Sequence, residues 1–386
     1  MLTEQTIWTI GLCLVGEEIW FTSADFNGLF RADIKTGEVK FVSQISILGK
    51  NQELSFSCVI QKDDFLYLCP FVSNCICEYN METDKMQFFF LDDVKEAYVN
   101  RAFCVKDKIF MFCDQKHMVV IFDLADKKIS YVKKHEQEKH CYDKIHDMVC
   151  VEERFFSADG CRIIETDLQL KKRAEYDIGK YSEGKEIKTI AFSKNGFWLL
   201  CDKTTLLFWN KEKDKVNVYT VPDLGTARKS YINEQVLYIF YPDTNRILIF
   251  NMEDKDVIVV HTEKFGYQTE QPKIFLPFLK DSTEGVYFYS YINSGINLLK
   301  SNGELTSVKL FMRDMDSFLI DYIGAGFYHE GEAFYENEKY FGGLDYFLNC
   351  IRKENAEKSF GETENGNGSL IYNKIKESMG SGNESV

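Results

Sequence analysis

Short apolar runs separated by polar turns make up most of this chain. Residues 29–42 read LFRADIKTGEVKFV, in which one apolar run ends at Asp33, a polar turn follows, and a second apolar run begins. The runs have the length of strands and are rich in β-branched and aromatic residues, and none is long enough for a helix. The pattern predicts antiparallel β-hairpins.

The same hairpin outline returns along the chain with an Asp or Asn at the end of its first run. Because a side-chain oxygen can accept hydrogen bonds from the backbone N–H groups of the next residues, we expect each marker to hold its turn. A seventh copy, LLKSNGELTSV at 298–308, keeps the turn without the marker. The markers recur every 41 to 47 residues and are Asp33, Asn80, Asp123, Asp167, Asn210 and Asn251.

Each repeat holds two more runs before its hairpin, so one unit contains four strand-length segments. The second segment of each unit has a central aromatic residue, such as Trp20, Tyr67 or Trp198. Four strands in roughly 40 to 50 residues, repeated with no helix between them, are typical of a propeller blade. We therefore predict an all-β fold, a β-propeller of seven four-stranded blades, with eight blades as the alternative.

The alternation of an aromatic residue, an Asp or Asn, a turn and an apolar run resembles the repeat of the β-propeller superfamily that includes WD40, kelch and quinoprotein-like proteins. The resemblance covers about 12–312. The Trp-Asp dipeptide of WD40 repeats and the paired glycines of kelch repeats are absent. The resemblance therefore points to the superfamily and to no single family within it. It implies a rigid platform, because propellers of this kind mostly act as one.

The chain is expected to contain a propeller at 1–350 and a flexible tail at 351–386. A circular array of sheets must be closed, and strands at 6–10 or 333–337 are the candidates for that role. The tail is rich in Glu, Gly, Asn, Ser and Lys and has too little apolar surface to fold alone. Within it, SLIYNKIKE at 369–377 has apolar residues at helical spacing and is a candidate short helix.

Composition and net charge indicate which classes of partner and which cellular compartment the protein is expected to have. The 386 residues include 60 acidic and 46 basic side chains, for a net charge of -14, which disfavours nucleic acid and membrane surfaces. No basic residue precedes the apolar run at 7–15, so we expect no secretory signal and a cytoplasmic protein. The 12 cysteines are expected to be reduced, and those in first strands, such as Cys58 and Cys104, suit the crowded centre of a ring.

Small polar side chains recur where the second strand of a unit links to the third. Such a ring could hold a partner, a sugar or another small molecule, although tight turns use the same residue types. We expect the aromatic members, Phe26 and Tyr241, to be exposed anchors. The candidate ligand-binding residues are Asp25, Phe26, Asn27, Asn74, His117, Asp159, Asp202, Tyr241, Asp243, Asn245 and Asn293.

These patterns favour a non-enzymatic scaffold that binds a protein or peptide through one loop-rimmed face. The alternatives are a channel-centred enzyme of the lactonase or lyase kind and a carbohydrate-binding module. No catalytic residue, metal site or cofactor is assigned. His135, His140 and His146 lie near Cys141 and Asp143, but their spacing matches no familiar zinc pattern, and we expect a solvated link there.

Overall fold

The computed structural model describes residues 9–23, 27–45, 56–71, 73–92, 94, 97–113, 118–133, 145–262, 275–276, 281–282, 285–290, 295–313 and 318. The chain divides into two compact units. One comprises Thr6–Ile45 and Glu53–Phe311, and the other comprises Met1–Gln5, Ser46–Gln52 and Met312–Val386. Of the second unit only 312–313 and 318 are described, so the boundary expected at 350 and the helix expected at 369–377 lie outside the described residues.

The first unit contains seven antiparallel sheets, which we call blades 1 to 7 in chain order. Blades 1 to 3 are formed by β1 (Thr9–Val15), β2 (Glu18–Ser23), β3 (Gly28–Asp33), β4 (Val39–Gln44), β5 (Phe56–Lys62), β6 (Phe65–Pro70), β7 (Cys75–Asn80), β8 (Lys85–Phe90), β9 (Arg101–Val105), β10 (Lys108–Cys113), β11 (Met118–Asp123) and β12 (Lys128–Lys133).

Blades 4 to 6 follow the same order, and blade 7 departs from it in its first strand. They are formed by β13 (Ile145–Val151), β14 (Arg154–Asp159), β15 (Arg162–Thr166), β16 (Lys172–Asp177), β17 (Ile187–Ser193), β18 (Gly196–Cys201), β19 (Thr205–Asn210), β20 (Lys215–Thr220), β21 (Lys229–Asn233), β22 (Val236–Tyr241), β23 (Arg246–Asn251), β24 (Val257–His261), β25 (Phe275–Leu276), β26 (Asp281–Ser282), β27 (Gly285–Ser290), β28 (Gly295–Leu299) and β29 (Leu305–Lys309).

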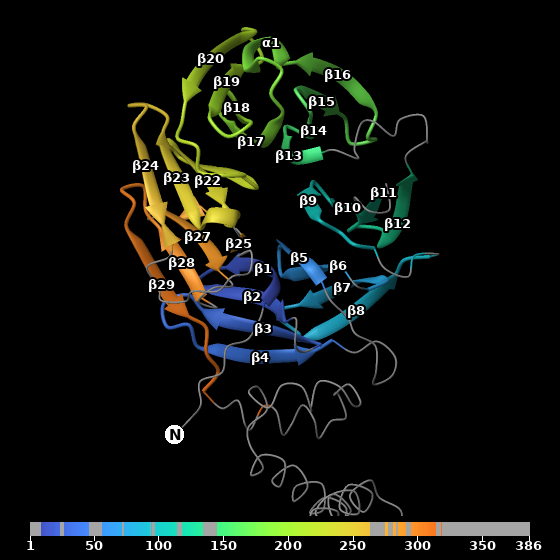
Figure 1. Cartoon of the computed structure of the whole chain (residues 1–386). Helices are drawn as coiled ribbons and strands as arrows, with labels where there is room; N and C mark the ends of the chain where they lie inside the picture. Colours follow the sequence, from blue (N-terminus) through green and yellow to red (C-terminus); the bar gives the residue numbers. More distant parts are fainter. Residues whose placement is uncertain are drawn as a thin grey trace, which may run out of the picture. The chain divides into compact units, whose positions relative to one another are not determined.

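The seven sheets stand radially in a ring, so the predicted seven-bladed β-propeller is confirmed (Figure 1). Each blade is built from one contiguous segment, and its strands pair in chain order from the inside outward. The first strands of neighbouring blades pack against one another, as β13 and β17 do. In blade 7 two short pieces, β25 and β26, both pair with β27 in place of one first strand. The sequence between them begins with Pro277, which cannot donate to a sheet ladder.

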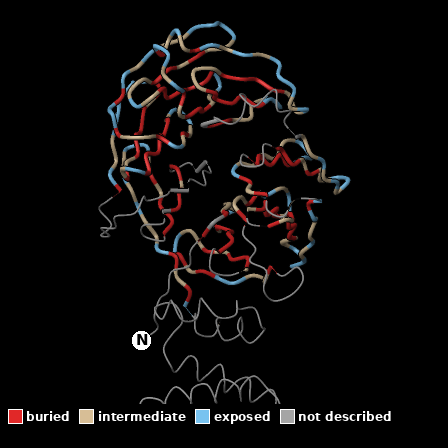
Figure 2. Tube along the Cα trace, turned by 45° about the vertical axis from the view of Figure 1, so that its right-hand side comes forward, coloured by how far each residue is buried: buried red, intermediate tan, exposed pale blue. Residues whose placement is uncertain are grey.

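The core lies between the faces of adjacent blades. Second and third strands are buried on both faces, whereas fourth strands alternate between covered and exposed positions (Figure 2). The central aromatic residues fill these seams: the ring of Trp198 lies 5.3 Å from that of Phe250 in the next blade. Cysteines take part as small apolar residues, and burial raises the pKa of the Cys201 thiol to about 12.

The marker residues act as predicted. The Oδ1 atom of Asp33 accepts hydrogen bonds from the backbone N–H groups of Lys35 at 2.9 Å and Thr36 at 2.8 Å. The same Oδ1 interaction occurs at the other five markers, Asn80, Asp123, Asp167, Asn210 and Asn251. Blades 1 to 6 therefore each hold their outer hairpin through a local side-chain contact.

Of the two expected clasps, the described part of 6–10 does not act as one, and the other cannot be compared with the structure. Thr9 and Ile10 belong to β1, which pairs with β2 of its own blade, and 333–337 lies outside the described residues. Instead, Phe311, two residues after the end of blade 7, bridges in parallel to Glu38 in the outer turn of blade 1. Its carbonyl accepts from Val39 N–H at 2.8 Å, and its N–H donates to the Gly37 carbonyl at 3.0 Å. In the described residues each blade is built from its own strands, and this closure involves no strand exchange.

Candidate functional site

The two ends of the propeller differ in their connections. At one end, tight turns join first to second strands and third to fourth strands. At the other, which we call the loop end, lie the links from second to third strands and the connections between blades, such as 178–186 with the short helix α1 (Gly179–Ser182) and 221–228. Binding residues concentrate on loops held by a rigid scaffold. The described candidate residues lie at this loop end, because each is the last residue of a second strand or belongs to the link that follows it.

The structure describes seven of the candidate residues. Asp25, Phe26, His117 and Asn293 lie outside the described residues, as do His135 and His140. Among the residues that are described, no group of three or more His, Cys, Asp or Glu side chains could hold a metal ion. Nor does any helix of the described ranges have the length and apolar character needed to cross a membrane.

Tyr241 is not an exposed anchor, which corrects the expectation from sequence. Its side chain is 0% exposed and packs among Leu200, Val221 and Leu224 in the seam between blades 5 and 6. The cause is the alternation of β22, in which Leu237, Ile239 and Tyr241 all face blade 5. Burial raises the pKa of the Tyr241 phenol. Within the described residues its hydroxyl has no hydrogen-bond partner.

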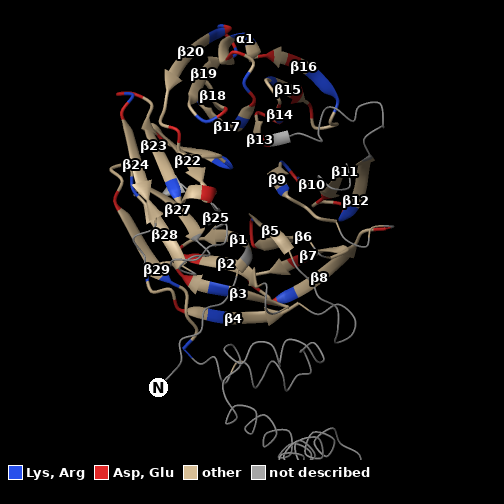
Figure 3. Cartoon of the chain, in the orientation of Figure 1, with Lys and Arg blue, Asp and Glu red and all other residues tan. Residues whose placement is uncertain are grey.

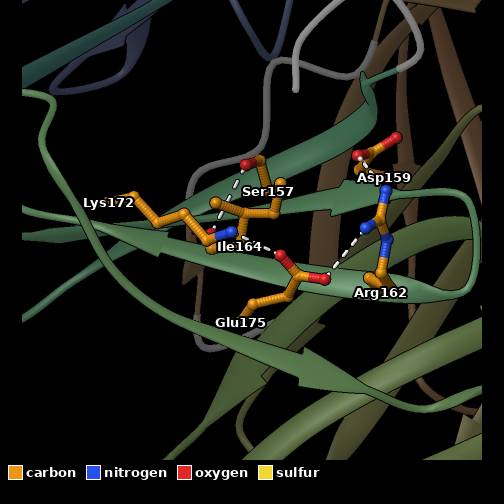
Figure 4. Close-up of polar contacts among 6 residues, drawn as sticks. All are labelled: Ser157, Asp159, Arg162, Ile164, Lys172 and Glu175. Carbon is orange, nitrogen blue, oxygen red and sulfur yellow. Dashed lines mark hydrogen bonds and ion pairs between the residues drawn. The ribbon is translucent and has the colours of Figure 1, made fainter. Parts of the chain in front are cut away.

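Asp159 is engaged in an ion pair across its own link. The carboxylate is nearly buried, and its Oδ2 atom lies 3.2 Å from Arg162 Nη2 (Figure 4). The other terminal nitrogen of Arg162 binds Glu175 at 2.9 Å, and Glu175 also pairs with Lys172. Asp159 therefore anchors a surface network that joins β14, β15 and β16.

The three described asparagine candidates use their backbone carbonyls to hold the end of the fourth strand to the link between second and third strands. The carbonyl of Asn27 accepts from Ile45 N–H at 2.8 Å, that of Asn74 from Leu91 at 2.7 Å, and that of Asn245 from Thr262 at 2.9 Å. In each case the donor lies just beyond the fourth strand, so one structural role recurs in blades 1, 2 and 6.

The remaining candidates are turn residues. Asp202 and Asn245 have positive φ angles of 57° and 51°, in the left-handed region that Asn and Asp tolerate best after glycine. Asn245 ends the short 3-10 turn η3 (Pro242–Thr244), and Asp243 within that turn is exposed. Of the described candidates, Asp243 is the one whose side chain is open to a partner.

Sequence reasoning missed an ion pair at the inner edge of the loop end. Lys229, at the start of β21 in blade 6, extends past blade 5 to Asp147 of β13 in blade 4, with Nζ 2.7 Å from Oδ1. The second oxygen of Asp147 accepts from Ile190 N–H of blade 5 at 3.2 Å. The Asp147 side chain is 2% exposed, whereas that of Lys229 is 36% exposed. The one available signal was a carboxylate inside an apolar first strand.

This pair fixes an ammonium group at the mouth of the ring. A lysine ammonium has three N–H donors, and Asp147 takes one of them. The other two N–H groups of the partly exposed Lys229 ammonium can donate to a carboxylate or carbonyl that enters from the loop end. Nearby first strands also carry a cation in their first two residues, Arg101 in β9 and Lys188 in β17, and Lys188 pairs with Glu186 at 2.6 Å.

Comparison with known proteins identifies a shared architecture. No family model and no curated protein matches the chain. Similar solved structures include the virginiamycin B lyase of Staphylococcus aureus, 9% identical with a TM-score of 0.55 over 76% of this chain and 96% of that one. The protein PorZ of Porphyromonas gingivalis is 11% identical with a TM-score of 0.52, over 79% and 39% of the two chains.

A computationally designed protein, Ika8, is 12% identical, with a TM-score of 0.52 over 79% of this chain and 87% of that one. At such identities these likenesses concern the fold and carry no activity with them. The chain is a seven-bladed β-propeller.

Proposed function

We propose that this β-propeller is a binding scaffold whose loop end holds a protein or peptide partner. The observation that carries the proposal is the Lys229 ammonium at the mouth of the ring, which is held by Asp147, whose second carboxylate oxygen accepts from Ile190 N–H. In a chain with a net charge of -14, a fixed cation at that place favours an acidic group, such as the C-terminal carboxylate or an Asp or Glu side chain of the partner.

The loop end has the construction of a rigid platform. The connection at 221–228 packs Val221, Leu224 and Ala227 into the seam between blades 5 and 6. Its Leu224 carbonyl accepts a hydrogen bond from the Thr244 hydroxyl at 2.5 Å, which ties the connection to η3. A platform that is ordered before binding loses little conformational entropy when a partner docks.

Site-specific photo-crosslinking tests this proposal. Benzoylphenylalanine is introduced singly at Asp243 or Lys203 on the loop end and, as matched controls, at Lys194 or Gln235 on the opposite end, all four of which are exposed. In cells that express the protein, we expect one shared partner to be captured from the two loop-end positions and not from the controls. Lys229→Met in the same background should reduce that capture. Equal capture from both ends would contradict the proposal.

The second candidate is a channel-centred enzyme, and the Asp147–Lys229 pair is the observation in its favour. A carboxylate and an ammonium in contact at the inner edge could exchange a proton with a bound substrate. The similar lyase suggests a probe, since a variant of it was crystallised with quinupristin. Quinupristin is incubated with the wild-type protein and with Asp147→Asn, and the intact antibiotic is followed by liquid chromatography. Loss of intact quinupristin with the wild type but not with Asp147→Asn supports an enzymatic function. No loss with either protein counts against that function.

A further inference from the structure

Among the described strands, the fourth strand of each blade pairs along one backbone edge only, and six of these seven strands carry a basic residue. An unpaired edge can pair with another chain, and natural sheets prevent this chiefly with lysines on the edge strand. The basic residues of β4, β8, β12 and β16 are visible in Figure 3. The guarding residues are Lys40 in β4, Lys85 in β8, Lys128 in β12, Lys172 and Arg173 in β16, Lys215 in β20, and Lys309 in β29.

The exception is β24 of blade 6, which reads VIVVH and has no Lys, Arg or Pro. Val257 and Ile258 are 37% and 38% exposed, and they are consecutive, so both faces of the strand present an apolar side chain to solvent. Four β-branched residues in a row give β24 a high tendency to remain extended. The outer edge of β24, which pairs with no other strand in the part of the chain that the structure describes, is therefore a preformed template for another strand.

The turn before β24 gives the edge a negative charge. Glu253, Asp254 and Asp256 are exposed, and no ion pair with another described residue engages them. The cation of this turn, Lys255, is directed inward, where its ammonium donates to the Met252 carbonyl and lies 5.5 Å from the Tyr219 ring centre and 5.8 Å from that of Trp198. Three exposed carboxylates, of which Asp254 accepts a hydrogen bond from Asn251 Nδ2 at 3.1 Å, thus lie beside an apolar edge.

We propose that β24 is a strand-addition site for an extended peptide of a partner protein, one that carries β-branched residues next to lysine or arginine. Main-chain hydrogen bonds to the free edge would supply affinity, and Val257 and Ile258 would contact alternate side chains of the peptide. The carboxylates at 253, 254 and 256 would select the basic residues. This site lies on the outer wall of blade 6 and is separate from the loop end.

A second copy of the chain is the less favoured occupant. Two copies would each bring a net charge of -14, and that charge opposes their approach. A basic peptide meets the opposite field, which attracts it to the same edge. Charge therefore distinguishes the two occupants.

The test measures peptide binding to the full-length protein by fluorescence anisotropy. The probe is a short fluorescein-labelled peptide in which valine alternates with threonine between terminal lysines. A matched peptide with N-methylated amides removes the hydrogen-bond donors and keeps the side chains. A third peptide replaces the lysines with glutamates. We expect saturable binding of the first peptide and at least about tenfold weaker binding of each of the other two.

Two protein variants locate the site. Ile258→Lys introduces the guard that the other blades have, and it should weaken binding of the first peptide at least about tenfold. Val218→Lys is the matched control, because Val218 is 56% exposed on the already guarded β20, and it should leave binding within about twofold. Thermal melting checks that both variants fold.

Three results would overturn the proposal: no binding of the first peptide, equal binding of the N-methylated peptide, or equal binding by Ile258→Lys. Sedimentation of the wild-type protein without peptide tests whether a second copy of the chain occupies the β24 edge. Self-association that Ile258→Lys abolishes would make a second copy the occupant and would overturn the assignment to a partner peptide.

Discussion

Lys211 Nζ of blade 5 lies 2.6 Å from Glu165 Oε2 of blade 4 and ties the two blades together at their outer seam. The Glu165 side chain is 3% exposed and also accepts hydrogen bonds from Arg154 at 2.6 Å and Tyr176 at 2.7 Å. The Lys211 ammonium lies 4.9 Å from the ring centre of Phe156. Glu165 is thus a buried carboxylate with three donors, two of them charged.

The arrangement recurs between blades 2 and 3. Lys127, in the outer turn of blade 3, pairs with Glu78 of blade 2 and lies 5.3 Å from the Phe65 ring centre. Glu78 and Glu165 both stand two residues before the marker of their blade, Asn80 and Asp167. The same device therefore locks two separate blade pairs.

We predict that Lys211→Met lowers the free energy of unfolding by about 2 kcal/mol. This is below the roughly 3–5 kcal/mol that loss of one partner costs in a fully buried pair, because Lys211 is 27% exposed. Urea denaturation measures it, and a double-mutant cycle with Glu165→Gln isolates the pair. The control is Lys172→Met, which breaks the exposed pair with Glu175 and should cost less than about 1 kcal/mol. Equal costs for the two lysine variants would contradict the prediction.

We predict that the stability contributed by Glu165 depends on pH. Burial by itself raises the pKa of this carboxyl, but the hydrogen bonds from Lys211, Tyr176 and Arg154 outweigh it and hold the pKa below its ordinary 4.5. The group binds protons more weakly in the folded state, so its contribution is present above pH 4.5 and is lost as the pH falls through the lowered pKa. The stability difference between wild type and Glu165→Gln should therefore shrink below pH 4.5 and stay constant above it.

We predict that Gly37→Ala destabilises the ring closure by about 3 kcal/mol. Gly37 has a φ of 76°, and a Cβ there would lie 2.1 Å from the Lys309 carbonyl oxygen of blade 7. Gly16 is the matched control, since its φ is 62° and a Cβ there would have no neighbour within 4 Å. Gly16→Ala should cost only about 1 kcal/mol, from the backbone conformation alone. Calorimetric melting measures the loss of stability in each variant. Equal losses for Gly37→Ala and Gly16→Ala would falsify this account.

We predict that the marker side chains tolerate exchange between Asp and Asn but not removal. Asn80→Asp keeps an oxygen that can accept from Glu82 and Thr83 N–H, as Asp33 does in blade 1, and should change stability by less than about 0.5 kcal/mol. Asn80→Ala leaves those donors without the acceptor and should cost about 1 kcal/mol. Chemical denaturation compares the two, and similar losses for both would show that the side-chain oxygen does not hold the turn.

The parts of the fold that the sequence predicts are those encoded locally. A marker and the N–H groups it binds lie within four residues of each other, so a repeated Asp or Asn reveals a repeated turn. Strand count and blade number follow from the same periodicity. Ring closure does not, because it depends on a contact between Gly37 and Phe311, which no local pattern connects.

The site was harder to predict for two physical reasons. Both faces of a blade are covered by its neighbours, so β22 is apolar throughout and shows no alternation of polar and apolar residues. The sequence therefore does not indicate which face Tyr241 occupies or that its hydroxyl is buried. The Asp147–Lys229 pair joins residues 82 positions apart on non-adjacent blades. The position of the loop end, by contrast, follows from strand order alone, since all second-to-third strand links lie at one end of a propeller.

Within the described residues, each sheet of this ring is encoded by one uninterrupted stretch, and the junction at Phe311 joins the end of blade 7 to the outer turn of blade 1 without borrowing a strand. Copying or deleting such a stretch in the gene would add or remove a complete blade and leave no sheet missing a member. Propellers sealed by a shared blade lack this freedom, because their two chain ends must keep matching each other. In this architecture, ring size can change through single duplication events.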